Sequence, residues 1–230
     1  MLKENLINVQ KNIERAAEAA KRDPKDITLI AVSKTKPLSD IEELIGYNVT
    51  EFGENKVQEL QTKYENVSTP VNWHLIGHLQ TNKVKYIIDK ACLIHSVDSV
   101  HLAEEIEKCA SKKGIIVNIL IQVNIACEDT KFGLKKEEVL PVIEEISKFP
   151  HVRIKGLMTI APFVENAEDN RIHFRNLHQL LLDIKSKNID NVDMSILSMG
   201  MTNDYEIAIE EGATMVRVGT GIFGERDYSI

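Results

Sequence analysis

The last fifteen residues, 216-VRVGTGIFGERDYSI-230, hold the glycine pattern on which the choice of fold depends. Gly219, Gly221 and Gly224 have the G-x-G-x-x-G spacing of a dinucleotide-binding loop, and a strand-like run precedes them. That loop works only where the glycines follow a strand, open a helix and are trailed by a ribose-binding acid about 20 residues on. Only residues 225–230 follow here, too few for the helix and the second half of a nucleotide fold. We therefore expect a different use for a flexible backbone at this position.

The composition is that of one globular α/β domain spanning residues 1–230, because 43% apolar content can bury a large core and no linker or repeat interrupts it. A net charge of -7 argues against general nucleic-acid binding, which needs a clustered basic surface. No apolar run resembles a signal peptide or a membrane helix. The 3 cysteines are far apart and lack C-x-x-C spacing, so we expect neither a metal site nor a disulfide. The sequence predicts a soluble cytoplasmic protein that does not bind membranes.

Strand and helix patterns alternate along the whole chain. The run ITLIAVSK, 27–34, is β-branched and nearly continuously apolar, as expected of a strand buried on both faces of a parallel sheet. Similar runs recur, each followed by an amphipathic stretch except the last. The expected strands are 27–34, 49–53, 72–78, 93–98, 117–125, 153–161, 193–200 and 214–224.

Eight strands separated by helices favour a closed (β/α)8 barrel of the TIM type over an open doubly wound sheet, which is the alternative. Neither a helix nor a C-terminal β-domain is expected after the eighth strand, so one flank of the barrel is expected to need a cover. The amphipathic helix within residues 1–22 has Leu6, Val9 and Ile13 on one face and is expected to supply it.

The loops after strands seven and eight are expected to form a phosphate site, as they commonly do in these barrels. The first loop offers the hydroxyls of Ser198 and Thr202 and a helix start with Asn203 as its N-cap. The second offers Gly219 and Thr220, where a missing side chain lets the backbone approach a ligand. The alternative is that the glycines only form turns; two such loops in the two expected positions favour phosphate.

Three more polar residues stand at strand ends or within strands. Ile30, Val32 and Lys34 share one face of the first strand, so the amine of Lys34 is expected at the barrel mouth, where partial desolvation favours a Schiff-base nucleophile. A solvated lysine is the alternative. Arg217 is the polar member of MVRVG and either binds a ligand or forms a buried ion pair with a glutamate. Asn55 either contacts the same ligand or caps a helix.

The segments AVSKTKP, FGENKVQE, HLIGHLQTNK, GLMTI, LSMGMTNDYEIAI and TMVRVGTGIFGERDY closely resemble the pyridoxal phosphate homeostasis proteins, relatives of the barrel domain of alanine racemase. The resemblance runs nearly end to end. It implies pyridoxal 5'-phosphate as cofactor, held as an internal aldimine on Lys34, with Arg217 facing the pyridine nitrogen. It also implies a role for Lys131 in cofactor exchange. The cofactor-binding residues it implies are Lys34, Asn55, Ser198, Thr202, Arg217, Gly219 and Thr220.

The implied function is a carrier or buffer of pyridoxal phosphate without robust enzymatic activity, which passes the cofactor to apo-enzymes. An arginine only donates to the pyridine nitrogen, so the ring stays a poor electron sink. None of the five tyrosines is expected as a base at the mouth. A weakly active racemase or lyase is the alternative, and a cofactor-free aldolase acting on a phosphorylated sugar is a further one. Analogy with the family implies a monomer.

Overall fold

The computed structural model describes residues 1–128 and 131–225, and its strands form a closed parallel barrel in the order β1 to β8. β8 returns to β1, with Arg217 opposite Ile30, which confirms the barrel prediction and makes the open sheet wrong. The strands are β1 Thr28–Val32, β2 Glu51–Glu54, β3 Asn72–Leu75, β4 Ala91–Val97, β5 Val117–Gln122, β6 Val152–Met158, β7 Val192–Met201 and β8 Met215–Val218.

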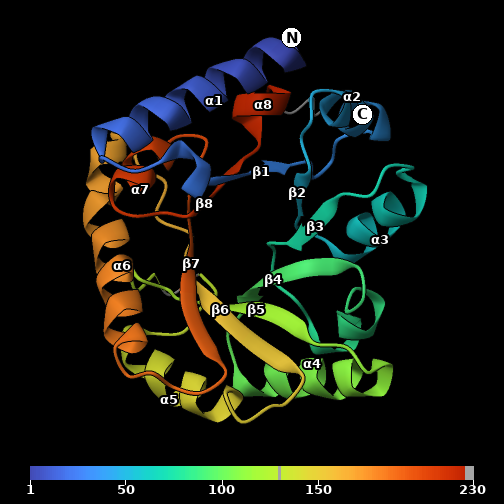
Figure 1. The fold of residues 1–230 in the computed structure, drawn as a ribbon, viewed down its shortest axis with the longest axis vertical. Helices are drawn as coiled ribbons and strands as arrows, with labels where there is room; N and C mark the ends of the chain where they lie inside the picture. The colour runs from blue at the N-terminus through green and yellow to red at the C-terminus, as the bar shows by residue number, and fades with distance from the viewer. Residues whose placement is uncertain (129–130, 226–230) are drawn as a thin grey trace.

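Helices surround the barrel and bury their apolar faces against it (Figure 1). Local signals set several ends: the Ser99 hydroxyl accepts from the Leu102 N–H at the start of α4, and Gly114, with φ 64°, ends it. The α-helices are α1 Leu2–Ala19, α2 Leu38–Gly46, α3 Val57–Asn66, α4 Val100–Lys113, α5 Lys136–Ile146, α6 Arg171–Lys185, α7 Tyr205–Glu210 and α8 Thr220–Phe223, and the 3-10 helices are η1 Pro24–Asp26, η2 Thr81–Tyr86 and η3 Ala167–Asn170.

Two connections differ from the expected pattern. β3 is followed by the 3-10 helix η2, which buries Val84 alone and so lacks the apolar face of a longer α-helix. The expectation of no helix after β8 was wrong, because the Gly219 carbonyl accepts from the N–H groups of Ile222 and Phe223 and starts α8. Both of these apolar side chains are buried.

The N-terminal helix covers the flank where the barrel closes, as predicted. α1 packs against α7 and α8 (Figure 1), with Val9 and Ile13 buried beneath it. The side-chain amide of Asn5 donates to the Ile222 carbonyl over 3.0 Å. The first and last described helices, α1 and α8, therefore cover the flank where β8 pairs with β1.

The barrel interior is apolar in one part and polar in another. Leu93, Leu120 and Met158 form a small buried cluster of their own, separate from the main core between strands and helices. Buried polar groups occupy other positions, among them His95 of β4 and Arg217 of β8. Buried polar groups need hydrogen-bond partners, so we expect the polar side chains inside the barrel to bind one another.

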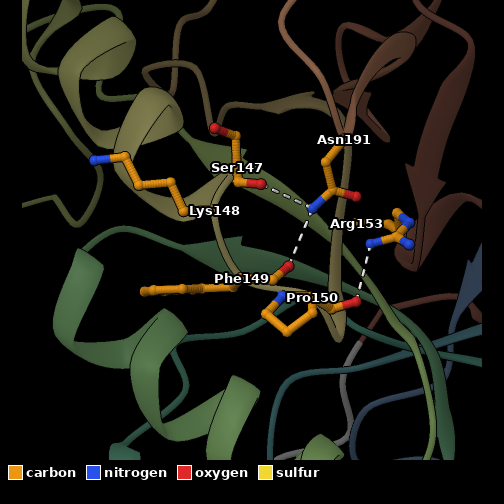
Figure 2. Close-up of a pocket in the computed structure, with 6 residues that line it drawn as sticks. All are labelled: Ser147, Lys148, Phe149, Pro150, Arg153 and Asn191. Carbon is orange, nitrogen blue, oxygen red and sulfur yellow. Dashed lines mark hydrogen bonds between the residues drawn. The ribbon is translucent and has the colours of Figure 1, made fainter.

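One asparagine holds together the chain segments that lead into β6 and β7. Asn191, with φ 69°, donates from its side-chain amide to the carbonyls of Ser147 and Phe149, each over 3.1 Å, and of Val152 over 2.8 Å. Figure 2 shows Asn191, Ser147 and Phe149 in the lining of a shallow cavity. Asparagine tolerates the left-handed conformation that this position requires. The polar groups at this turn therefore serve mainly to bind backbone.

No helix within residues 1–128 or 131–225 is both long and apolar enough to cross a bilayer.

Candidate functional site

A cavity of about 620 Å³ opens at the C-terminal ends of the strands. Its volume lies within the roughly 300–1,000 Å³ common for small-molecule sites. Its lining comes from loops that are far apart in the sequence and that meet only at the barrel mouth. Six of the seven residues expected from the sequence line it: Lys34, Asn55, Thr202, Arg217, Gly219 and Thr220.

Lys34 reaches the cavity because of the alternation along β1. Ile30 and Val32 are buried, and Lys34 follows on the same side just beyond the strand. The preceding N–H of Ser33 donates to the Gly53 carbonyl over 3.1 Å, so the sheet pairing extends to the residue next to the lysine. Lys34 is half-buried and lines the cavity.

A buried ionic cluster holds the ends of β1 and β2 in place beside Lys34 and Asn55. Lys63 donates to the Ser33 carbonyl over 2.6 Å and to Glu54 Oε1 over 2.7 Å, and the Ser33 hydroxyl donates to that same carboxylate over 2.6 Å. Burial raises the pKa of the Glu54 carboxyl, and the charge of Lys63 opposes this. Sequence reasoning missed Lys63, although its three-residue spacing from the buried Val57 and Leu60 placed it on the apolar face of α3.

The two loops expected to form a phosphate site touch each other. The Gly221 N–H donates to Thr202 Oγ1 over 3.3 Å. A Cβ on Gly221 would lie 2.9 Å from Val218 Cγ1 and 3.3 Å from Thr202 Cγ2, so only glycine allows this approach. The loops after β7 and β8 therefore form one continuous wall of the cavity.

The expected N-cap at Asn203 was wrong. α7 begins at Tyr205 with Asp204 as its N-cap, because the Asp204 carboxylate is held by the Met201 N–H over 2.7 Å and by Asn170 over 2.8 Å. Asn203 still lines the cavity.

Ser198 lies beneath the cavity instead of in its wall. It is fully buried in β7, where its hydroxyl accepts from Arg217 over 2.6 Å and lies 2.9 Å from His95 Nδ1. Ser198 therefore contacts Arg217 directly and does not line the cavity.

Arg217 forms the floor of the cavity and is 3% exposed. Besides Ser198, its guanidinium donates to the Thr159 carbonyl over 2.8 Å. Within the described ranges it has no carboxylate within ion-pair distance, so the expected alternative of a buried ion pair with a glutamate was wrong. Burial lowers the pKa of Arg217 to about 10, and the charge of Asp204 opposes this. The group remains a cation and a donor at neutral pH.

A chain of hydrogen bonds continues from Arg217 through the barrel. Beyond Ser198, His95 Nε2 lies 2.9 Å from His74 Nδ1, and His74 Nε2 lies 2.7 Å from the Glu51 carboxylate. Burial, with the nearby charges of His74 and Arg217, holds the pKa of His95 well below its usual value, so its imidazole is neutral. The sequence analysis did not assign either histidine, although both lie within expected strands.

Lys131 and two phenylalanines form part of the cavity entrance. Lys131 donates to the Ala161 carbonyl over 3.1 Å and pairs with Glu128. Phe132 stacks on His78, with ring centroids 3.9 Å apart, and Phe163 is 85% exposed. Lys131 thus stands at the same cavity as Lys34, which its sequence position alone does not predict.

The tyrosines whose positions are described lie away from the cavity lining. Tyr205 is buried and accepts from Asn12 of α1 over 3.1 Å. Tyr47, Tyr64 and Tyr86 also lie outside the lining, and Tyr228 lies outside the described residues.

Comparison with known proteins agrees with this geometry. The family described as "Alanine racemase, N-terminal domain" matches residues 5–227. The "Pyridoxal phosphate homeostasis protein" of Aquifex aeolicus is 45% identical over 226 residues, 98% of each chain. That of Pseudomonas aeruginosa is 40% identical over 227 residues, 98% of this chain and 96% of the relative.

A solved structure with the same fold is PipY of Synechococcus elongatus PCC7942 with PLP bound. It superimposes with a TM-score of 0.82 at 33% identity, over 93% of this chain and 100% of PipY. With full-length relatives at this identity, the chain belongs to the family of proteins with the alanine racemase N-terminal domain, among those named pyridoxal phosphate homeostasis proteins.

Proposed function

We propose that this protein binds pyridoxal 5'-phosphate reversibly through Lys34 and acts as a carrier or buffer of the cofactor. The observation that carries the proposal is that Lys34 and Arg217 line one cavity whose wall is the joined pair of loops at Thr202 and Gly221. The names of the relatives and the PLP bound to PipY support the same ligand.

The residues present fit the chemistry of this cofactor. When bound, pyridoxal phosphate offers an aldehyde that condenses reversibly with an amine and a ring that stabilises carbanions best when its nitrogen is protonated. Lys34 supplies the amine. Thr202, Thr220 and the backbone at Gly219 supply hydroxyl and N–H donors for a phosphate, and Asn55 lines the adjacent wall.

Arg217 would bind and orient the pyridine ring without driving carbanion chemistry. Its guanidinium carries donors only and remains protonated at neutral pH, so it has no proton-accepting atom with which to hold a proton on the ring nitrogen. Two of its donors are already held by Ser198 and Thr159. These contacts suit storage and orientation of the cofactor better than turnover.

Transfer of the cofactor to apo-enzymes is part of the proposal, with the protein acting as a cytoplasmic monomer. Apolar side chains stand exposed at the cavity entrance: Phe163 at 85%, Phe132 at 56% and Met201 at 37%. Exposed apolar groups around a ligand cavity are typical of surfaces that contact another protein. A recipient enzyme would bind this rim while the cofactor leaves.

The test is to mix the purified protein with pyridoxal phosphate, reduce it with borohydride and map the labelled peptide. We expect label on Lys34, a visible absorption band in the wild type, and loss of both in Lys34→Arg. Lys36→Arg is the matched control, because Lys36 lies two residues away and outside the cavity lining. Label that stays on another lysine in Lys34→Arg would contradict the proposal.

Lys131 is proposed to assist release. We expect Lys131→Arg to keep the label on Lys34 but to pass cofactor several-fold more slowly to an apo-enzyme, because arginine keeps the charge and cannot condense with the aldehyde. An unchanged transfer rate would show that Lys131 does not assist release of the cofactor.

A racemase or lyase remains the alternative outcome. Loaded protein is incubated with single amino-acid enantiomers in deuterated water and exchange of the α-proton is followed. Exchange near the roughly 1–10³ s⁻¹ typical of enzymes would favour catalysis over carriage. We expect exchange far slower than this, since Tyr205 packs against α1 and the other described tyrosines lie outside the lining.

A further inference from the structure

Three side chains of different chemistry meet at the N-terminal end of the barrel, remote from the cavity. Glu51 is the first residue of β2, His74 lies in β3 and Cys92 lies near the start of β4. His74 Nε2 is 2.7 Å from Glu51 Oε2 and 3.6 Å from Cys92 Sγ. The donor atoms of all three lie within 4.8 Å of one another.

These separations suit a tetrahedral metal ion. Zinc binds imidazole nitrogen at about 2.0–2.1 Å and thiolate sulfur at about 2.3 Å, so two such ligands at a tetrahedral angle stand about 3.6 Å apart. His74 Nε2 and Cys92 Sγ are at that separation already. A nitrogen and a carboxylate oxygen would stand about 3.3 Å apart, so Glu51 has to move by roughly 0.6 Å, which a rotation of its side chain provides.

The proposed ligands are held by neighbours in the way that metal ligands usually are. Asn72 donates to Glu51 Oε1 over 2.6 Å and leaves Oε2 directed at His74. His74 Nδ1 lies 2.9 Å from His95 Nε2. An ion on Nε2 requires the proton of His74 on Nδ1, where it donates to the neutral His95. Such outer contacts fix ligand orientation and raise affinity.

The site is open to solvent on one side. Cys92 is exposed and Glu51 is half-buried, which gives an ion an entry path and leaves room for water as fourth ligand. Coordination displaces the thiol proton of Cys92, which passes to solvent, while the proton of His74 is on Nδ1.

We propose that Glu51, His74 and Cys92 form a binding site for one zinc-class divalent ion. The mixed sulfur, nitrogen and oxygen donors select against magnesium and calcium, which prefer oxygen alone. A bound ion would link the three neighbouring strands β2, β3 and β4. Because the site lies at the opposite end of the barrel from Lys34, its occupancy can be tested without pyridoxal phosphate.

The experiment titrates reduced, cofactor-free protein with Co²⁺ as a spectroscopic probe and with Zn²⁺ against a chromophoric chelator. We expect one equivalent of either ion, a thiolate-to-cobalt charge-transfer band and release of protons on binding. Cys92→Ser should abolish the band and weaken Zn²⁺ binding at least tenfold. Cys127→Ser, which removes another exposed thiol outside the site, should change neither.

His74→Gln and Asn72→Ala extend the test. His74→Gln should also abolish high-affinity binding, and Asn72→Ala should weaken it by about 10- to 100-fold, as loss of an outer contact does. Circular dichroism establishes that each variant is folded. Absence of the band at one equivalent in the wild type, or a band that survives Cys92→Ser, would overturn the proposal. Neither result affects the cofactor proposal, which is tested by the label on Lys34.

Discussion

Lys63→Met is the substitution with the largest expected effect on the framework of the cavity. Methionine keeps most of the side-chain volume but removes the ammonium that donates to the Ser33 carbonyl, to Glu54 and, over 2.8 Å, to Glu59. The Glu54 carboxylate is fully buried, and among the described residues its Oε2 already lacks a hydrogen-bond partner. The variant therefore leaves a buried negative charge with only the Ser33 hydroxyl.

Breaking a buried ion pair by removing one partner destabilises a protein by about 3–5 kcal/mol. Most domains are stable by only about 5–15 kcal/mol, so this loss is a large part of the total. For a chain of this size each kcal/mol lowers the unfolding midpoint by about 2–4 °C, which predicts a fall of roughly 6–20 °C. Lys56→Met, at the exposed N-cap position that precedes the same helix, should change stability by less than about 0.5 kcal/mol.

The assay is urea unfolding followed by tryptophan fluorescence. Trp73 is the single tryptophan, is 2% exposed, and packs on Phe52 of the strand that carries Glu54. The double variant Lys63→Met/Glu54→Met removes both charges, and apolar replacement of a buried pair is often close to neutral. We expect it to be more stable than Lys63→Met. A double variant as unstable as the sum of the two singles would refute the electrostatic explanation.

The pH dependence gives an independent check. Burial raises the pKa of Glu54, and in Lys63→Met no ammonium opposes this shift. The folded variant then binds a proton more tightly than the unfolded chain, so its stability falls as pH rises above the carboxyl's usual value of about 4.3. The deficit relative to wild type should be smaller at pH 5 than at pH 8. An equal deficit at both would indicate lost packing instead.

Three further substitutions test the cavity and the opposite end of the barrel. Ser198→Ala removes a hydrogen-bond partner of the buried Arg217, so it should lower the free energy of unfolding in urea by about 1.5–3 kcal/mol and weaken cofactor binding. Unchanged cofactor affinity would show that Ser198 does not support the site. Gly221→Ala places a methyl group 2.9 Å from Val218 Cγ1, so overpacking of about 1–3 kcal/mol and weaker phosphate binding are expected, and a neutral result would show that the loops can part. Asn191→Ala removes three hydrogen bonds to carbonyls and should lower the free energy of unfolding by about 2–3 kcal/mol with no change in cofactor affinity. A change in cofactor affinity would show that the two ends of the barrel are energetically coupled.

Much of the fold could be predicted because its signals are local. The alternation of apolar residues marks each strand, and eight such units with intervening helices leave few closed arrangements. The same alternation put Lys34 at the mouth of the barrel. The details that failed depend on contacts between distant segments: α8 packs under α1, with Ile222 and Phe223 buried, and the carboxylate of Asp204, the N-cap of α7, is held by Asn170 as well as by the nearby Met201 N–H.

The sequence by itself determined the barrel, the cover by its first helix, and the placement of Lys34, Thr202 and Gly219 at strand ends, since these follow from periodicity and order along the chain. Only the tertiary structure decided that Ser198 lies under Arg217 and that Cys92 approaches His74. Contacts of this second kind join side chains from different strands. Their meeting depends on the register between strands, which closure of the barrel sets and no single segment contains.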